Sequence, residues 1–292
     1  MAFEFHKDKD TYIKWQYENA KNYVIPFIEK TLPLSKGMRV MEIGCAEGGV
    51  LKAFTDRGCF GFGVELQESR LKIAEKVFEK ELQEGNAKLM SKNIYDMDLQ
   101  SDIDEKFDLI ILKDVIEHIH DQDRFLEYIR DFLKPNAHIF FGFPPWQMPF
   151  GGHQQLVNGK LLSKLPYYHL LPMPLYKLLL KLGGESETKI EGMVEIKETG
   201  ISIERFERLS KKNNYSIPLK QFYLINPIYK YKFNLKPRNQ LSFLSAIPYF
   251  RNYWTSCVYY LIRKEVSFKP SDVITSNKKG CSILLEHPFH LF

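Results

Sequence analysis

The sequence predicts an α/β protein built around a doubly wound, mostly parallel β-sheet. Apolar segments of strand character alternate with helical segments between residues 39 and 143, and this alternation is typical of parallel sheets. A loop of small residues, 44–49, follows the first strand, and a single carboxylate, Glu65, ends the second. Ligands of such open sheets bind beyond the carboxyl ends of the strands, so both features predict a binding site at that edge.

The expected elements follow in the order that this fold requires. A helix over residues 10–30 carries aromatic side chains at helical spacing, and Pro33 ends it. Further helices are expected over residues 49–57, 69–82, 122–132 and 202–213. Seven strands are expected over residues 39–43, 61–65, 87–92, 107–112, 138–143, 216–225 and 255–263.

The loop after the first strand indicates which kind of cofactor would bind. Glycines let the backbone approach a ligand, and a carboxylate such as Glu65 accepts both hydroxyl groups of a ribose. The loop lacks the Gly-x-Gly-x-x-Gly spacing of dinucleotide sites, and Glu47 within it would repel a pyrophosphate. Glu42, two residues before Gly44, is placed to hold an ammonium group. The pattern therefore favours a cationic, phosphate-free nucleoside cofactor.

Four motifs in sequence order resemble the class I S-adenosylmethionine-dependent methyltransferases. Residues 42–48 (EIGCAEG) are similar to the first motif of that family, and Glu65 stands at its ribose-binding acid. Residues 107–112 are similar to its fourth strand, and 114–119 (DVIEHI) follow as in the small-molecule members of the D-V-I-E-H type. Residues 133–143 are similar to the turn and fifth strand. The resemblance implies a Rossmann-like, seven-stranded sheet with an antiparallel last strand, and S-adenosylmethionine as cofactor.

The resemblance also implies which residues hold the cofactor. Glu42 would anchor its amino-acid end, Glu65 would bind its ribose, and Asn93 and Ile94 would face its adenine. Asn93 stands where many members have an aspartate, so Asp96 is an alternative adenine contact. The expected cofactor-binding residues are Glu42, Gly44, Cys45, Ala46, Gly48, Glu65, Leu66, Asn93, Ile94, Lys113 and Val115.

Two segments exceed what this sheet needs. Residues 144–200 and 226–253 are rich in aromatic and basic side chains. We expect both to form a cap over the active site, as insertions in a methyltransferase domain that spans residues 36–263. Within residues 1–35 we expect a helix that acts as a lid on the cofactor, and residues 264–292 are expected to be a flexible tail.

Charge and cysteine content narrow the choice of partner and compartment. The net charge is +5, but residues 151–263 hold 17 Lys and Arg against 7 Asp and Glu, which suits an anionic acceptor. Residues 174–182 are apolar with lysines four apart, so peripheral membrane contact is an option. Four cysteines without a Cys-x-x-Cys pair, and the absence of a signal-peptide pattern or membrane-length apolar run, favour a cytoplasmic protein. The oligomeric state is left open.

Two histidines are the candidates for catalysis. His118 follows the fourth expected strand, and His153 lies in a loop after the fifth, where it and Gln154 would point toward the mouth of the site. Either imidazole would act as a general base or orient the substrate loop. No metal site is expected, because His118 and His120 are two residues apart and would not share a helix face, and no third ligand has suitable spacing.

The favoured function is methyl transfer from S-adenosylmethionine to an oxygen atom of an anionic acceptor that is small or linked to a lipid or glycan. Transfer to a nitrogen atom is the second choice. Three alternatives stay open. A nucleic-acid methyltransferase would use the basic cap on phosphates, although the sequence shows no nucleic-acid-binding module. An aminopropyl transferase would need an acidic polyamine tunnel, and a non-catalytic protein would bind the cofactor without turnover.

Overall fold

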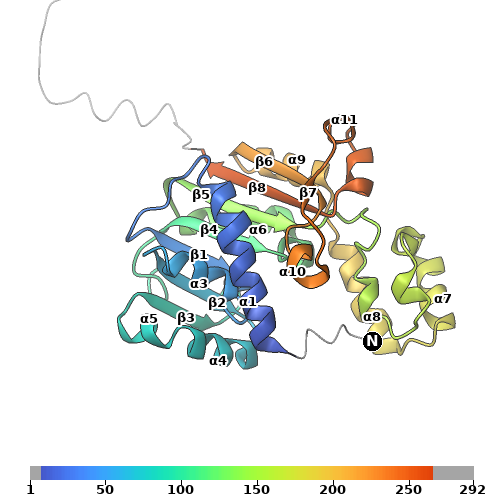
Figure 1. Ribbon diagram of the computed structural model, residues 1–292, viewed down its shortest axis with the longest axis horizontal. Helices are drawn as coiled ribbons and strands as arrows, with labels where there is room; N and C mark the ends of the chain where they lie inside the picture. The colour runs from blue at the N-terminus through green and yellow to red at the C-terminus, as the bar shows by residue number, and fades with distance from the viewer. Residues whose placement is uncertain (1–7, 266–292) are drawn as a thin grey trace, which may run out of the picture.

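A single eight-stranded sheet forms the centre of the computed structural model, which describes residues 8–265 apart from the side chain of Gln155. The strands are β1 (Arg39–Ile43), β2 (Phe60–Glu65), β3 (Ala87–Ser91), β4 (Phe107–Lys113), β5 (Leu133–Phe143), β6 (Tyr215–Ile225), β7 (Arg238–Asn239) and β8 (Cys257–Lys264). Their order is β3-β2-β1-β4-β5-β8-β6-β7 (Figure 1). β1 to β5 pair in parallel, whereas β8 is antiparallel to both of its neighbours. The mostly parallel sheet with an antiparallel last strand is thus confirmed.

One strand was not among the seven expected. β7 has two residues and pairs antiparallel with the outer edge of β6, at Tyr223 and Ile225. A segment of two residues is too short to show any hydrophobic alternation, so no sequence pattern could have predicted it.

The helices comprise those expected from the sequence, which lie close to their predicted positions with one break, and four α-helices in the two insertions that were not predicted. They are α1 (Lys9–Asn19), α2 (Ile25–Ile28), α3 (Gly49–Thr55), α4 (Glu68–Val77), α5 (Glu79–Gln83), α6 (Gln122–Tyr128), α7 (Met173–Leu182), α8 (Glu187–Thr199), α9 (Ile203–Lys212), α10 (Tyr229–Phe233) and α11 (Ser242–Ser245). A π-helical turn, Ala20–Val24, joins α1 to α2. The helix expected over residues 69–82 is divided at the buried Phe78, whose φ of −104° and ψ of 13° leave the helical region.

Both faces of the sheet are buried, which explains its long apolar runs. In β4, Ile110 and Leu112 pack with side chains of α6 and α9, whereas Leu109 and Ile111 pack with α2 and α3 on the opposite face. α1 crosses in front of the sheet in Figure 1. Because the faces are covered, a ligand can reach the sheet only at its edges.

The two expected insertions carry secondary structure of their own. α7 and α8 lie to one side of the sheet in Figure 1 and pack on a separate apolar cluster. This cluster consists of Val157, Leu162, Tyr168, Tyr176, Leu180, Ile190 and Met193. The second insertion contains α10, β7 and α11 and contacts α1, where the Tyr231 hydroxyl donates to the carbonyl oxygen of Glu18 at 3.3 Å. The insertions meet at Tyr167, whose hydroxyl donates to the carbonyl oxygen of Tyr253 at 3.3 Å.

The two ends of the chain are only partly described by the structure. Almost all of the expected tail, 264–292, and the start of the segment 1–35 lie outside the described residues. Among the residues that the structure describes, no helix has the length and apolar character needed to cross a bilayer.

Candidate active site

The turn after β1 depends on two glycines with left-handed backbone. Gly44 has φ +71° and Gly48 has φ +85°, a region that side chains with a Cβ rarely adopt. A Cβ on Gly44 would lie 2.8 Å from Val115, and one on Gly48 would lie 2.5 Å from the ring of Phe78. The turn is therefore fixed both by its dihedral angles and by the side chains packed against it.

Glu65, at the end of β2, is bound to this turn. One carboxylate oxygen accepts a hydrogen bond from the backbone N–H of Ala46 at 2.9 Å, and the other accepts from Gln67 at 3.0 Å. Each carboxylate oxygen has two lone pairs, so acceptor capacity remains for a ligand. The acid that the sequence singled out is thus held in a fixed position beside the turn.

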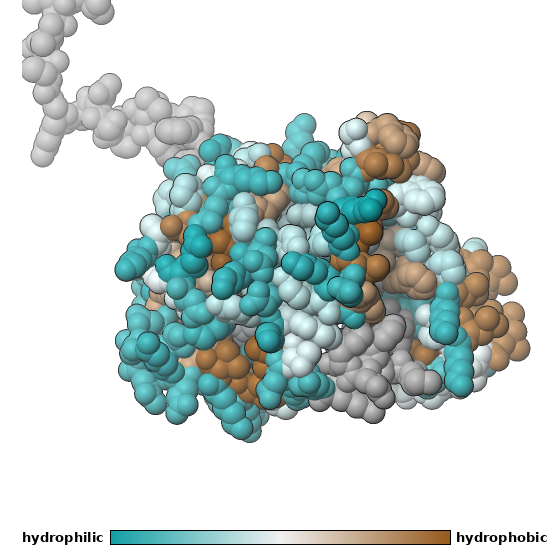
Figure 2. Space-filling model, in the orientation of Figure 1, coloured by the Kyte–Doolittle hydropathy of each residue, from teal (hydrophilic) through white to brown (hydrophobic). Residues whose placement is uncertain are grey.

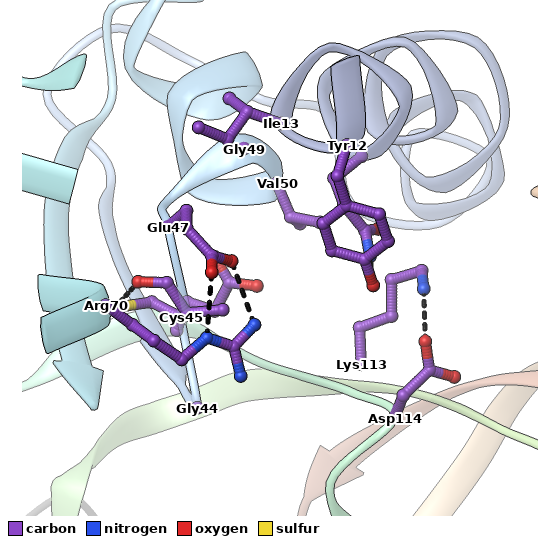
Figure 3. Close-up of a pocket in the computed structure, with 13 residues that line it drawn as sticks. Tyr12, Ile13, Gly44, Cys45, Glu47, Gly49, Val50, Arg70, Lys113 and Asp114 are labelled. Atoms are coloured by element: carbon purple, nitrogen blue, oxygen red, sulfur yellow. Dashed lines mark hydrogen bonds and ion pairs between the residues drawn. The ribbon is translucent and has the colours of Figure 1, made fainter. Parts of the chain in front are cut away.

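A cavity of about 140 Å³ lies beyond the carboxyl ends of β1 and β4, between α1 and the turn (Figure 3). It is lined by Tyr12, Ile13, Gln16, Glu42, Gly44, Cys45, Ala46, Glu47, Gly49, Val50, Arg70, Lys113 and Asp114. Five of the expected cofactor-binding residues are in this lining: Glu42, Gly44, Cys45, Ala46 and Lys113.

Six expected cofactor-binding residues are not among the residues that line the cavity. They are Gly48, Glu65, Leu66, Asn93, Ile94 and Val115. The side chain of Leu66 is 68% exposed, and Ile94 is buried in the core. The Asn93 side-chain oxygen accepts a hydrogen bond from the backbone N–H of Tyr95 at 3.0 Å, which leaves it one lone pair for another donor.

Glu42 is the deepest acid of the cavity. It is buried, and its carboxylate accepts a hydrogen bond from the backbone N–H of Leu51 at 2.9 Å. Burial raises the pKa of Glu42 to about 8, because the charged form is poorly solvated there. Without a ligand this carboxyl group is therefore mostly protonated at neutral pH, and a bound cation would favour its ionised form.

Two charged pairs at the cavity were not foreseen from the sequence. Arg70 of α4 binds both carboxylate oxygens of Glu47, at 3.0 and 2.8 Å (Figure 3). Contrary to the expectation that Glu47 would repel an anion, this arginine balances the charge of Glu47. Arg70 lies 23 residues further along the chain in a helix, and nothing in its local pattern marks it as a site residue.

Lys113 and Asp114 form the second pair, with 2.5 Å between the ammonium nitrogen and a carboxylate oxygen. Asp114 has a left-handed backbone, with φ 57°. Burial alone would lower the pKa of Lys113, but Asp114 and Tyr12 together outweigh burial and raise it. In Figure 3 the hydroxyl group of Tyr12, from α1, points toward Lys113. The cavity therefore offers a fixed cation at one end and the acid Glu42 inside.

The structure brings the two candidate catalytic histidines together. The rings of His118 and His153 are 5.2 Å apart, although the residues are 35 positions apart in sequence. Glu117 joins them, and one possible ligand atom from each residue lies within 4.8 Å of the other two. Burial, and then the neighbouring His118, lowers the pKa of His153 to about 4. Glu117 is next to His118 in sequence, and folding brings His153 to this pair from the loop after β5, which sequence spacing could not show.

Gln154 does not point toward the mouth of the site, contrary to the expectation. Its side chain is fully buried, and its amide nitrogen bonds to the ring of His169 at 2.7 Å and to the carbonyl oxygen of Pro149 at 3.2 Å. The other ring nitrogen of His169 bonds to the carbonyl oxygen of Trp146 at 2.8 Å. Gln154 therefore stabilises the loop that carries His153.

Comparisons with known proteins agree with this geometry. A family model described as a methyltransferase domain matches residues 16–163, about half of the chain. Curated relatives include the ubiquinone biosynthesis O-methyltransferase of Coxiella burnetii, 27% identical over 117 residues, which are 40% of this chain and 47% of the relative. The protein of the same name from Leptothrix cholodnii is 25% identical over 114 residues, 39% of this chain and 47% of the relative. The chain thus spans about half the length of the curated relatives it matches.

Solved structures show the same fold at low identity. The plantazolicin methyltransferase BpumL, in complex with a triazolic desmethylPZN analogue and SAH, has a TM-score of 0.52 at 12% identity, and the match covers 90% of this chain and 89% of that one. A phosphoethanolamine N-methyltransferase of Haemonchus contortus has a TM-score of 0.52 at 14% identity, and the match covers 89% of this chain and 58% of that one. From the family match, the sheet order and the turn after β1, the chain belongs to the class I S-adenosylmethionine-dependent methyltransferases.

Proposed function

We propose that this protein transfers a methyl group from S-adenosylmethionine to an oxygen atom of an anionic acceptor that is small or linked to a lipid or glycan. A nitrogen atom of such an acceptor is the second choice. The observation that carries the proposal is the cavity between α1 and the glycine turn, with Glu42 inside it and Glu65 bound to the turn. The cofactor, when bound, supplies a methyl group on a positively charged sulfur that is already a good leaving group. The names of the curated relatives support an oxygen acceptor.

The residues present fit this cofactor. Glu42 is a buried acid whose ionised form gains from an ammonium group nearby, and Lys113 suits a carboxylate at the same end. Glu65 has free lone pairs for a ribose. The remaining roles follow the resemblance: close backbone approach at Gly44, Cys45, Ala46 and Gly48, adenine contact at Asn93 and Ile94, and the edge of the pocket at Leu66 and Val115.

We assign the general base to His118 ahead of His153. A base works best when its pKa is near the operating pH, and a pKa of about 4 makes His153 a weak one. Desolvation also lowers the pKa of His118, but the carboxylates of Asp114 and Glu195 oppose this shift. His118 lies just after the end of β4, beside the cavity-lining Asp114. In this assignment His118 accepts the proton of the acceptor hydroxyl group, and His153 orients the acceptor.

The N-terminal helix and the two insertions would enclose the reaction. Tyr12, Ile13 and Gln16 of α1 line the cavity, which supports a lid within residues 1–35. The insertions at 144–200 and 226–253 would form the cap within the domain 36–263, and their basic side chains suit an anionic acceptor. Excluding water around a charged leaving group strengthens every electrostatic contact in the site.

A lipid-linked acceptor is supported by an apolar surface on the first insertion. Figure 2 shows hydrophobic side chains gathered over α7. We call the exposed leucines there the α7 surface: Leu161, Leu165, Leu175, Leu178 and Leu182.

The opposite side of α7 is apolar as well. Tyr176 and Leu180 are fully buried in the first insertion, so the exposed leucines of α7 form a second apolar face, which lies uncovered beside Lys177 and Lys181. Lys160, Lys164 and Lys177 are exposed close to these leucines in sequence, so we propose that an anionic lipid surface is that cover. We further propose that the protein acts in the cytoplasm, where the free thiols Cys45, Cys59 and Cys257 would stay reduced.

Transfer of a labelled methyl group tests the proposal. The full chain is incubated with S-adenosylmethionine carrying tritium in the methyl group, together with small hydroxy acids, extracted acidic lipids, or RNA and DNA. We expect label in an acid or lipid fraction, and a kcat lowered about 10²–10⁴-fold by His118→Ala but unchanged by His120→Ala. His120 is a matched control because it is exposed, bonded to Glu195 at 3.1 Å, and two residues away.

Three results would contradict the proposal. Label only in nucleic acid would favour the nucleic-acid methyltransferase. Cofactor binding with no label in any fraction would favour a non-catalytic binding protein. Equal kcat in wild type and His118→Ala would remove His118 from the reaction.

A further inference from the structure

Glu117, His118 and His153 meet because the carboxyl ends of β4 and β5 are neighbours. β4 and β5 pair in parallel, so the segments that leave them emerge at the same edge of the sheet. Glu117 and His118 lie in the 3₁₀ turn Ile116–His118 after β4, and His153 lies in the loop after β5. A possible ligand atom of each residue lies within 4.8 Å of the others.

Glu117 lacks a partner for one of its oxygens. The residue is 6% exposed, and its Oε2 atom is buried without a hydrogen bond. A buried carboxylate is costly unless a cation or donor satisfies it. A cavity of about 10 Å³ lies beside it, bordered by His153 and by Trp146, Ile196 and Gly151. That volume holds about one water molecule, or an ion of similar size.

We propose that Glu117, His118 and His153 bind one divalent transition-metal ion, for which Zn²⁺ fits the donor chemistry best. Two imidazole nitrogens and one carboxylate oxygen are a donor set that zinc uses where it keeps a coordination position open. Imidazole ligands select zinc and its neighbours in preference to magnesium or calcium. Bonds of about 2.0–2.2 Å place ligand atoms roughly 3.0–3.5 Å apart, so small side-chain rotations would close the observed gap.

Of the other groups near the site, two histidines are hydrogen-bonded to other residues, and the remaining two groups carry charges of opposite sign. His120 bonds to Glu195, and both ring nitrogens of His169 are bonded, so neither is a ligand. The carboxylate of Asp114 acts on both ligand histidines and favours a cation. The ammonium group of Lys232 acts on His153 and opposes one. The carboxylates of Glu117 and Asp114 together offset that opposing charge.

The ion would also have a role in the reaction, and this role rests on the proposed function. An ion with an open position binds an acceptor hydroxyl oxygen and makes the hydroxyl more acidic. With the ion bound, His118 and His153 would be ligands rather than bases, and the proton would leave to water; this would replace the general-base role assigned to His118 above.

The test is zinc binding to the full chain after removal of metals with a chelator and dialysis. Zn²⁺ alone is titrated by calorimetry, and Co²⁺ is used as a second probe through its visible ligand-field absorption. We expect one equivalent to bind, and Glu117→Gln and His118→Asn each to weaken binding by about 10-fold or more. His120→Asn should bind as the wild type does. Unchanged affinity for S-adenosylhomocysteine shows that each variant is folded; His118 is exposed, so its replacement should fold.

Several outcomes would overturn the metal site. These are no zinc binding, binding that both ligand variants retain, or binding of Mg²⁺ without Zn²⁺. Methyl transfer by a protein that binds no zinc would refute the metal site and leave the proposed function standing. Zinc binding without methyl transfer to any acceptor would support the metal site and refute the proposed function.

Discussion

At the scale of single residues, the buried acid Glu42 makes the stability of the fold depend on pH. Its pKa of about 8 in the folded protein lies above the ordinary value of 4.5. A group with a raised folded pKa stabilises the fold at low pH, and that stability is lost as the pH rises from the unfolded to the folded pKa. The wild type therefore loses stability through Glu42 between about pH 4.5 and pH 8.

Glu42→Gln removes this titration and keeps an oxygen for the hydrogen bond from Leu51. We expect the variant to gain stability relative to the wild type as the pH rises, by at most about 1.4 kcal/mol per pH unit. The gain should level off above pH 8. Urea unfolding of both proteins from pH 5 to pH 9 measures it. A constant difference over that range would mean that Glu42 stays ionised in the folded protein.

Gly48 offers a second test at residue scale, with Gly85 as its matched control. Both have left-handed backbone, with φ +85° and +72°, but a Cβ on Gly48 meets Phe78 at 2.5 Å while one on Gly85 meets nothing within 4 Å. Gly48→Ala should therefore cost about 1–3 kcal/mol more than Gly85→Ala. Denaturant unfolding of the two variants gives the difference. Equal losses would show that Phe78 moves aside without cost.

The sequence could identify those site residues that stand at a recognisable spacing from a predicted strand. Gly44, Gly48 and Glu65 follow strands at a recognisable spacing, and each has a position in the structure that its residue type explains. Arg70 and the unpartnered oxygen of Glu117 have no local signature. Their importance depends on side chains that folding brings from other segments, so sequence spacing alone could not reveal them.

At the scale of secondary-structure elements, burial decides what was predictable. Strands such as β4 are covered on both faces, so they appear as unbroken apolar runs. The division of the helix at Phe78 was not predictable, because helical periodicity continues across it while the buried ring sets the local backbone. β7 has too few residues to show a pattern.

The α7 surface gives the element-scale prediction. The full chain should float with vesicles of phosphatidylcholine and phosphatidylglycerol, and bind less to pure phosphatidylcholine. Leu178→Glu combined with Leu182→Glu should reduce binding by about 10-fold or more, since each buried leucine contributes roughly 1.5–3 kcal/mol.

Leu235→Glu is the control, because Leu235 is also exposed but lies in the second insertion. Binding that the double variant retains would assign membrane contact to another surface. No binding of the wild type to either vesicle would leave the α7 surface without a lipid partner.

At the scale of the whole molecule, the sheet order places three separate segments at one edge. The turn after β1, the segment Asp114 to His118 after β4, and the loop with His153 after β5 all leave neighbouring strands at their carboxyl ends. The alternation of strands and helices predicted this convergence in outline. It could not predict the distances, because these depend on how the insertions pack.

Binding of S-adenosylhomocysteine would show whether the cavity between α1 and the glycine turn takes the cofactor. Titration calorimetry would compare the wild type with Glu65→Ala and with Glu68→Ala, an acid three residues further on that is exposed and paired with Lys72. We predict micromolar binding by the wild type and Glu68→Ala, and binding weakened by about 10-fold or more in Glu65→Ala. Absence of binding by the folded wild type, or equal affinity in all three proteins, would contradict the account.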